Sequence, residues 1–240
     1  MRIISLVPSI TELLFDLGLK YQIIGRTKFC VHPHPEVNDI QRFGGTKNIH
    51  LDRIKEAKAD LIIANKEENL KSEIEELQQT ENVLITDIST LEENNAMIRE
   101  IGRLTHSTEK AEVLIDEINH AFDTLEIIKE KHTALYLIWQ EPYMSIGHDT
   151  FIHEMMDFAG FKNILRDKTR YPEVIPEDNI NPAYILLSSE PYPFEEKHIP
   201  AIQEKFPNSQ VILVDGEMFS WYGSRMRWAP AYFLNLRKSL

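Results

Sequence analysis

The chain has only one cysteine, Cys30, among its 240 residues, so no disulfide can form within it. This usage fits a reducing compartment without excluding an oxidising one. No apolar run approaches the roughly 20 residues that a membrane-spanning helix needs. Cations are also scarce, since Lys+Arg 26 against Asp+Glu 38 gives a formal net charge of −12. Binding to nucleic-acid phosphates depends on cationic side chains, so a nucleic-acid partner is not expected.

The common catalytic signatures are missing as well. The sequence has no glycine-rich dinucleotide or phosphate-binding loop, no Gly-x-Ser-x-Gly elbow and no Cys-x-x-Cys pair. The start shows no secretory leader, because Met1 and Arg2 lead directly into the apolar run Ile3–Val7, which predicts a first core strand. As written, the chain is therefore expected in the cytoplasm. A periplasmic or surface location is expected instead if a leader was removed.

What is present is a pattern that occurs in both halves of the chain. Short apolar runs alternate with amphipathic segments, at Ala59–Ala64 and Val83–Asp87 in the first half and at Ala183–Ser188 and Val211–Asp215 in the second. Short apolar runs that alternate with amphipathic segments are typical of βα units with parallel strands. Each half is therefore predicted to be one α/β lobe.

A long helix is predicted between these halves. Residues 109–131 contain no Gly or Pro, and apolar residues recur there at three- and four-residue steps. The sequence therefore predicts an α/β fold with two Rossmann-like lobes, residues 1–108 and 132–240, joined by one backbone helix. A ligand cleft is expected between the lobes, because small molecules commonly bind in such clefts.

Polar residues follow the predicted strands of the first half. Ser9 and Glu12 have the spacing of a capping box at the start of a helix. Glu67 and Glu68 follow the strand Ala59–Ala64, and ligands approach α/β sheets at the carboxyl ends of strands. Ser9, Glu67 and Glu68 are therefore candidate ligand-binding residues, although a plain helix cap and a solvated helix start explain them too.

The segment Phe29–Pro35 combines a thiol with two imidazoles. Pro33 favours an extended backbone at His32, which would let Cys30 and His32 converge on a metal ion. A closed zinc site needs four ligands, and no second pair completes one. Cys30 and His32 are therefore candidate ligands of an open metal site. A buried, apolar Cys30 with no metal role is an equally good interpretation.

Aromatic side chains gather in the predicted loops of the second half, and all three tryptophans are there. Flat aromatic surface beside fixed cations suits a large conjugated or anionic ligand. The candidate ligand-binding residues of this half are Trp139, Tyr143, Tyr192, Trp221, Tyr222 and Arg225.

With these residues the chain resembles the helical-backbone class of ABC-transporter substrate-binding proteins, which carry vitamin B12, haem, iron–siderophores and some metals. The resemblance is carried by residues 3–12, 44–46, 51–54 and 59–64 together with the long helix. It implies a receptor that is not an enzyme, whose ligand is a corrinoid, a haem or iron chelate, or a metal. No resident cofactor is expected, although cobalamin or a metal ion could be bound as cargo.

Within that class the chain is most similar to the B12-binding branch and to its leaderless relatives, the helical backbone metal receptors. The similar segments are residues 29–33, 67–69, 190–194 and 220–225, which adds Phe29 to the ligand-binding candidates. The resemblance also implies a monomer that docks onto a membrane permease through Glu73 and Glu196. The alternative function is a cytosolic metal or cofactor chaperone, or an enzyme, in which Cys30, His32 and Glu67 supply ligands or a general base.

Overall fold

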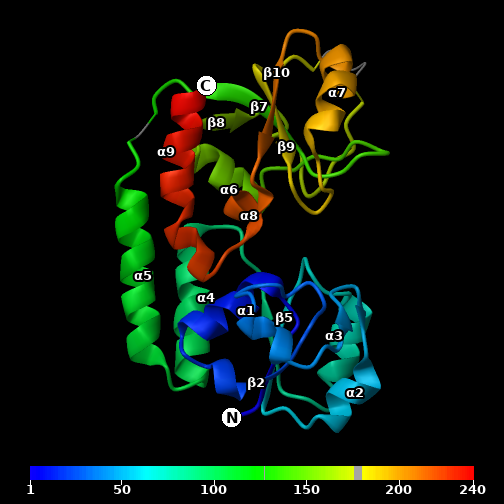
Figure 1. Cartoon of the computed structure of the whole chain (residues 1–240), viewed down its shortest axis with the longest axis vertical. Coiled ribbons are helices and arrows are strands. Elements are labelled where there is room, and N and C mark those ends of the chain that lie inside the picture. The colour runs from blue at the N-terminus through cyan, green and yellow to red at the C-terminus, as the bar shows by residue number, and fades with distance from the viewer. Residues whose placement is uncertain (127, 176–179) are drawn as a thin grey trace. The chain divides into compact units, whose positions relative to one another are not determined.

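The computed structural model describes residues 1–126, 128–175 and 180–240. These residues form two compact units, each built around a four-stranded parallel sheet (Figure 1). Unit 1 contains Met1–Ile88, Glu92–Ile118 and Tyr222–Arg225, and unit 2 contains Ser89–Leu91, Asn119–Trp221 and Met226–Leu240. The predicted α/β class with two lobes is confirmed.

Unit 1 holds the N-terminal sheet. Its strands are β1 (Ile3–Ser5), β2 (Ile23–Arg26), β5 (Leu61–Asn65) and β6 (Val83–Thr86), in the spatial order β2-β1-β5-β6. β3 (Gly44–Gly45) and β4 (Asn48–Ile49) form a separate antiparallel pair. Its complete helices are α1 (Pro8–Asp16), η1 (Lys20–Gln22), η2 (Glu36–Asp39), α2 (Leu51–Glu56) and α3 (Lys71–Leu77).

The core of unit 1 lies between its sheet and the neighbouring helices α2 and α3 (Figure 1). Ile4 and Ile62 are opposite each other in β1 and β5, and both are fully buried against Ile54 of α2 and Leu77 of α3. Strands that are covered on both faces read as continuous apolar runs, which is why these strands were predictable from the sequence.

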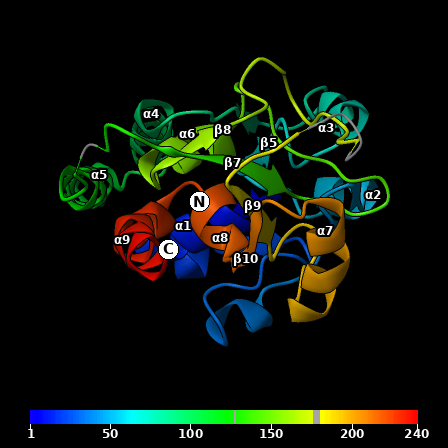
Figure 2. The ribbon, with the colours of Figure 1, turned by 90° about the horizontal axis from the view of Figure 1, so that it is seen from above.

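Unit 2 has a second sheet of the same kind. Its strands are β7 (His132–Leu137), β8 (Phe161–Asn163), β9 (Tyr184–Ser188) and β10 (Gln210–Val214), in the spatial order β10-β9-β7-β8. Its helices are α6 (Phe151–Phe158), η3 (Glu196–His198), α7 (Ile199–Lys205), α8 (Gly216–Ser220) and α9 (Ala229–Ser239). α7 lies alongside β10 (Figure 2), and Ile202 and Phe206 pack there against Ile185 and Leu187 of β9.

Three helices have residues in both units: α4 (Leu91–Leu104), α5 (Thr108–Asp123) and η4 (Ser224–Arg227). α5 corresponds to the predicted helix 109–131, but the prediction was wrong about its end. The Thr124 hydroxyl donates to the Ala121 carbonyl oxygen at 2.6 Å, and Leu125 N donates to Phe122 O at 3.0 Å. Both hydrogen bonds join residues three positions apart, as in a 3₁₀ turn, and they end the helix after Asp123. Residue 127 lies outside the described residues.

Within the described ranges, no helix has both the length and the apolar character that crossing a bilayer requires.

Candidate functional site

In unit 1 the loops that carry the predicted residues of the first lobe leave one edge of the sheet. Because β1, β2, β5 and β6 are parallel, their carboxyl ends meet at that edge. Ser9 follows β1, Phe29 to His32 follow β2, and Glu67 and Glu68 follow β5. The segment Tyr222–Arg225 belongs to the same unit, although the sequence placed Tyr222 and Arg225 in the second lobe.

The predicted capping box at Ser9 and Glu12 is wrong. α1 starts at Pro8 with Val7 as its N-cap, and no side chain caps it. Glu12 instead forms a bidentate ion pair with Arg225, whose Nε and Nη2 donate to the two carboxylate oxygens at 2.8 and 2.7 Å. The side chains of Arg225 and Glu12 are only 9% and 8% exposed. Burial raises the pKa of Glu12, although the hydrogen bond and charge of Arg225 oppose the shift.

This pair attaches the segment Tyr222–Arg225 to α1, and two further contacts support it. The N–H of Gly223 donates to Asn94 Oδ1 at 2.6 Å. Gly223 packs against α1, where a Cβ would be in ordinary contact with Ser9 O at 3.4 Å, but its φ of +88° is one that other residues rarely adopt. Glycine is therefore the residue that this position favours.

Tyr222 is buried beside the carboxyl ends of the strands. Burial raises the pKa of its phenol well above 10, while the nearby Ser9 and Thr86 oppose the shift. The negative charge of Glu68 raises this pKa further. The predicted residues Ser9, Glu68 and Tyr222 are therefore brought together within unit 1.

Two asparagines that the sequence analysis did not select shape the loop after β5. Asn65 Oδ1 accepts from the backbone N–H groups of Glu67 and Glu68 at 2.8 and 3.2 Å. Asn65 Nδ2 donates to Thr86 O at 3.0 Å, and Asn69 Oδ1 accepts from Asn65 N at 2.9 Å. An asparagine directly after a strand often makes such a turn, and this signal could have identified Asn65.

Glu68 is half-buried in this loop. Burial raises the pKa of its carboxyl group above the ordinary value of 4.5, the positive charge of Lys47 opposes the shift, and the negative charge of Glu67 adds to it. Lys47 Nζ also donates to the backbone carbonyl oxygen of Glu67. The loop therefore has a carboxyl group that holds its proton more firmly than an exposed glutamate would.

Cys30 is fully buried, as in the apolar interpretation of this residue. Burial raises the pKa of its thiol, although hydrogen bonds with Thr11 and Thr27 oppose the shift. A metal binds the thiolate form, so this environment does not favour a metal at Cys30. In the part of the chain that the structure describes, no group of three or more His, Cys, Asp or Glu side chains could hold a metal ion. The Cys30–His32 site stays a prediction without structural support.

Phe29 differs from its neighbour Cys30, because its ring is 50% exposed. The ammonium group of Lys28 lies 4.9 Å from the centre of that ring. Phe29 is therefore an accessible apolar residue at the strand ends of unit 1.

In unit 2 the loops after the strands carry an aromatic cluster. Trp139 follows β7, is 42% exposed, and lies edge-to-face with Tyr192 at 5.7 Å between ring centres. Tyr192 packs in turn on Phe194 at 4.7 Å. The backbone of Met144 bridges to Trp139 and to Glu173, which fixes the loop after β7. Tyr143 in the same loop has the Lys205 ammonium 5.6 Å from its ring centre.

Trp221 has a different environment from Trp139. It is only 8% exposed, and its Nε1 donates to Glu190 Oε1 at 2.8 Å. The hydroxyl of Ser220 donates to the same carboxylate oxygen. Glu190 therefore holds the indole of Trp221 in place, a function that the sequence analysis did not assign to it.

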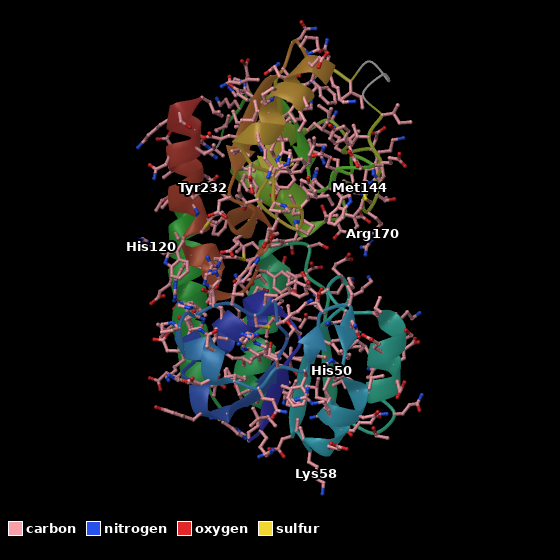
Figure 3. All side chains as sticks on the ribbon, turned by 45° about the vertical axis from the view of Figure 1, so that its right-hand side comes forward. His50, Lys58, His120, Met144, Arg170 and Tyr232 are labelled. Carbon is pink, nitrogen blue, oxygen red and sulfur yellow. The ribbon has the colours of Figure 1, made fainter. Side chains whose placement is uncertain are left out.

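A surface hollow of about 420 Å³ lies elsewhere on unit 1, at the start of α2 beside the labelled His50 (Figure 3). It is lined by Ile49 to Arg53 and by Glu76. None of the predicted ligand-binding residues lines it, so we do not assign the binding site to this hollow.

The two sheets and their strand-end loops define a two-lobed α/β binding protein. The chain belongs to the periplasmic binding protein family, whose model matches residues 3–211. It is 26% identical over 186 residues to a vitamin B12-binding protein of Pectobacterium atrosepticum, an alignment that covers 73% of this chain and 66% of that protein. It is also 26% identical over 201 residues to the ABC transporter substrate-binding lipoprotein YvrC of Bacillus subtilis, covering 78% and 63%.

The chain thus aligns with slightly less than two thirds of the length of these relatives. Among solved structures, S. aureus IsdE complexed with heme is similar in fold, with a TM-score of 0.82 at 18% identity. That similarity covers 99% of this chain and 97% of IsdE. These relatives are binding proteins for transport, as the sequence analysis expected.

Proposed function

We propose that this protein is the substrate-binding component of an ABC transporter and that its ligand is a corrinoid of the cobalamin type. The observation that carries the ligand class is Trp139, a half-exposed indole held in place by Tyr192 at the strand ends of unit 2. Flat conjugated macrocycles stack on such rings. The similarity to a vitamin B12-binding protein supports this class over a small polar ligand.

The residues of unit 1 would contribute polarity to the same function. Glu68 is partly exposed, and its carboxyl group, whose pKa is raised, can form a hydrogen bond with an amide side chain of a corrinoid, whereas the phenol of Tyr222 is buried. Phe29 would add apolar contact. The location of the ligand between the lobes stays a prediction from the sequence.

The ligand would be bound and released unchanged. Two predicted ligand-binding residues have a geometry that opposes direct contact with a ligand: Arg225 already holds Glu12 through its Nε and Nη2, and the buried Trp221 donates its N–H to Glu190. The alternative of a chaperone or enzyme based on Cys30, His32 and Glu67 is less favoured, since Cys30 is buried with a raised thiol pKa.

Partner docking is part of the proposal. Glu196 is exposed at η3, and Glu73 lies on α3, where its carboxylate accepts from Ile49 N at 3.5 Å. We propose these two glutamates as contacts for arginines of a permease. The monomeric state and the compartment stay predictions.

The test is calorimetric titration of the protein with cyanocobalamin, cobinamide and haem. We expect saturable binding of a corrinoid, and Trp139→Ala should weaken it by about 0.5–1.5 kcal/mol, the scale of one aromatic contact. Trp228→Ala is the matched control, because Trp228 is 43% exposed but lies at the start of α9 beside Arg227. Heat signals that stay flat with both corrinoids would refute the ligand class. Saturable binding of haem alone would reassign it to iron porphyrins.

A further inference from the structure

Arg26, the last residue of β2, is the largest fully buried side chain of the described residues, at 1% exposure. Its Nη1 donates to Thr27 O at 3.1 Å and to Cys30 O at 2.9 Å. Its Nε and Nη2 are equally buried, and among the described residues neither atom has a hydrogen-bond acceptor. One edge of the guanidinium is therefore satisfied, and the other presents its donors without a partner.

Other arginines of unit 1 show what this second edge binds. Arg99 uses Nε and Nη2 to hold both carboxylate oxygens of Glu112, at 2.7 and 3.0 Å. Arg103 holds Glu100 through the same two atoms at 2.8 and 2.7 Å. Arg225 does so with Glu12. In each case a planar oxyanion accepts two parallel hydrogen bonds, which is the geometry that the guanidinium fork favours.

The charges near Arg26 also favour an anion. Burial lowers the pKa of the Arg26 guanidinium, and the positive charge of Arg42 lowers it further. Cys30 is the one neighbour whose negative charge would oppose the shift, but burial raises the pKa of its thiol. A neutral thiol cannot neutralise a guanidinium, and a buried charge without a counter-charge is costly. An anion at the second edge would remove that cost.

We propose that the Nε–Nη2 edge of Arg26 binds a small oxyanion, a carboxylate or phosphate group, inside unit 1. The oxyanion is either a free anion such as acetate or phosphate, or an anionic group of a larger ligand. The site differs from the proposed corrinoid contacts, because none of them involves Arg26. The proposal therefore does not depend on the proposed function.

The first experiment measures melting temperature against the concentration of formate, acetate and inorganic phosphate at constant ionic strength. A bound anion stabilises the folded state by mass action, so the wild type should gain about 3–6 °C at ten times the dissociation constant. Arg26→Met removes the fork with little change of volume, and should abolish the saturable gain. Arg103→Met is the control for general salt effects, since Arg103 is exposed and already paired with Glu100.

The second experiment tests an anionic group of a larger ligand. Haem and its dimethyl ester differ only in their carboxylates, so esterification should weaken binding at least tenfold in the wild type but not in Arg26→Met. If the oxyanion is a free anion, only the saturable gain in melting temperature appears. If it is a group of a larger ligand, esterification weakens binding. If neither result appears, the proposal is overturned.

A third measurement covers the case in which Arg26→Met does not fold. The Nε–H resonance of Arg26 in nitrogen-15-labelled wild type should shift saturably with one of the three anions or with haem. An unchanged resonance with all of them would overturn the proposal without any variant.

Discussion

The strand-end loops of the two units contain different chemistry on the same architecture. In unit 1 hydrogen bonds hold the loops in place: Glu12 holds Arg225, and Asn65 holds the loop of Glu68. In unit 2 one carboxylate, Glu190, fixes the buried Trp221, while Trp139 stays half-exposed. One sheet edge is thus closed by polar bonds and the other offers aromatic surface.

The residue type alone therefore does not show whether a side chain is free to contact a ligand. Trp139 and Trp221 both follow strands or short helices of unit 2, yet Trp221 is bonded and buried, whereas Trp139 keeps an accessible ring. Arg225 and Arg26 are both buried arginines of unit 1. The Nε–Nη2 edge of Arg225 holds a carboxylate, whereas that edge of Arg26 has no acceptor among the described residues. What separates the members of each pair is the partner that the fold supplies.

The largest effect is expected at the buried ion pair of unit 1. Arg225→Met leaves the buried carboxylate of Glu12 without its counter-charge, so we expect the free energy of unfolding to fall by about 3–5 kcal/mol. Urea unfolding should show this loss, and most of it should return in the double variant Glu12→Leu/Arg225→Met. Arg103→Met is the matched control, because its exposed pair with Glu100 should be worth about 0–1 kcal/mol. Equal losses of unfolding free energy at the two arginines would contradict the larger contribution that we expect from the buried pair.

A smaller effect is expected on the aromatic side. Glu190→Ala removes the acceptor of the buried Trp221 N–H, and an unsatisfied buried donor costs about 1–3 kcal/mol. Urea unfolding measures the loss, and with Trp221→Phe, which has no N–H, the Glu190→Ala change should cost less, because only the hydrogen bond from Ser220 remains to be lost. Lys197→Ala serves as the control, since its pair with Glu195 is exposed. If Glu190→Ala costs as much with phenylalanine at position 221 as with tryptophan, the hydrogen bond does not explain the effect.

The smallest effect concerns the pH dependence of unit 1. Burial raises the pKa of Glu68 in the folded state, so the charged carboxylate destabilises the fold. The stability that comes from the bound proton is complete below the ordinary glutamate pKa of about 4.5, and it is lost as the pH rises through the pKa of the folded state. Glu68→Gln should therefore melt higher than the wild type at pH 8, and this advantage should shrink towards pH 4. Thermal melts across this range measure the difference.

Glu100→Gln provides a control of opposite sign for that experiment. The bond with Arg103 lowers the pKa of Glu100, so its contribution to stability is present above the ordinary glutamate value and is lost as the pH falls. We expect Glu100→Gln to melt slightly lower than the wild type at neutral pH, with no difference in acid. If Glu68→Gln followed the same sign, the raised pKa of Glu68 would be wrong.

Much of each sheet was predictable, because parallel strands covered on both faces must be apolar along their length. The run Ala59–Ala64 became β5 (Leu61–Asn65), and the run Ala183–Ser188 became β9 (Tyr184–Ser188), and both strands are buried along their whole length. The helix 109–131 was predicted too long, since periodicity reports buried positions and not the point at which the Thr124 hydroxyl competes for a backbone carbonyl.

The candidate site was predicted only in part. The sequence identified the strand-end loops of Ser9, Glu68 and Trp139, because side chains that follow parallel strands must emerge at one edge. Asn65 could have been identified by its position at the end of a strand, but Glu190 could not, since its partners Ser220 and Trp221 lie about 30 residues further along the chain.

The amino-acid sequence was sufficient to predict strands β1, β5, β6, β9 and β10, the α/β class, and the loops at the strand ends in which polar and aromatic residues gather, but it did not predict β2 or β8. Only the tertiary structure decided that Glu12 pairs with Arg225, a residue 213 positions away, and that the segment Tyr222–Arg225 completes unit 1. Periodicity records whether a residue faces the core, because burial repeats with the geometry of a helix or strand. The partner of a buried charge follows no local period, since it depends on which distant segments the folded chain brings within hydrogen-bonding distance.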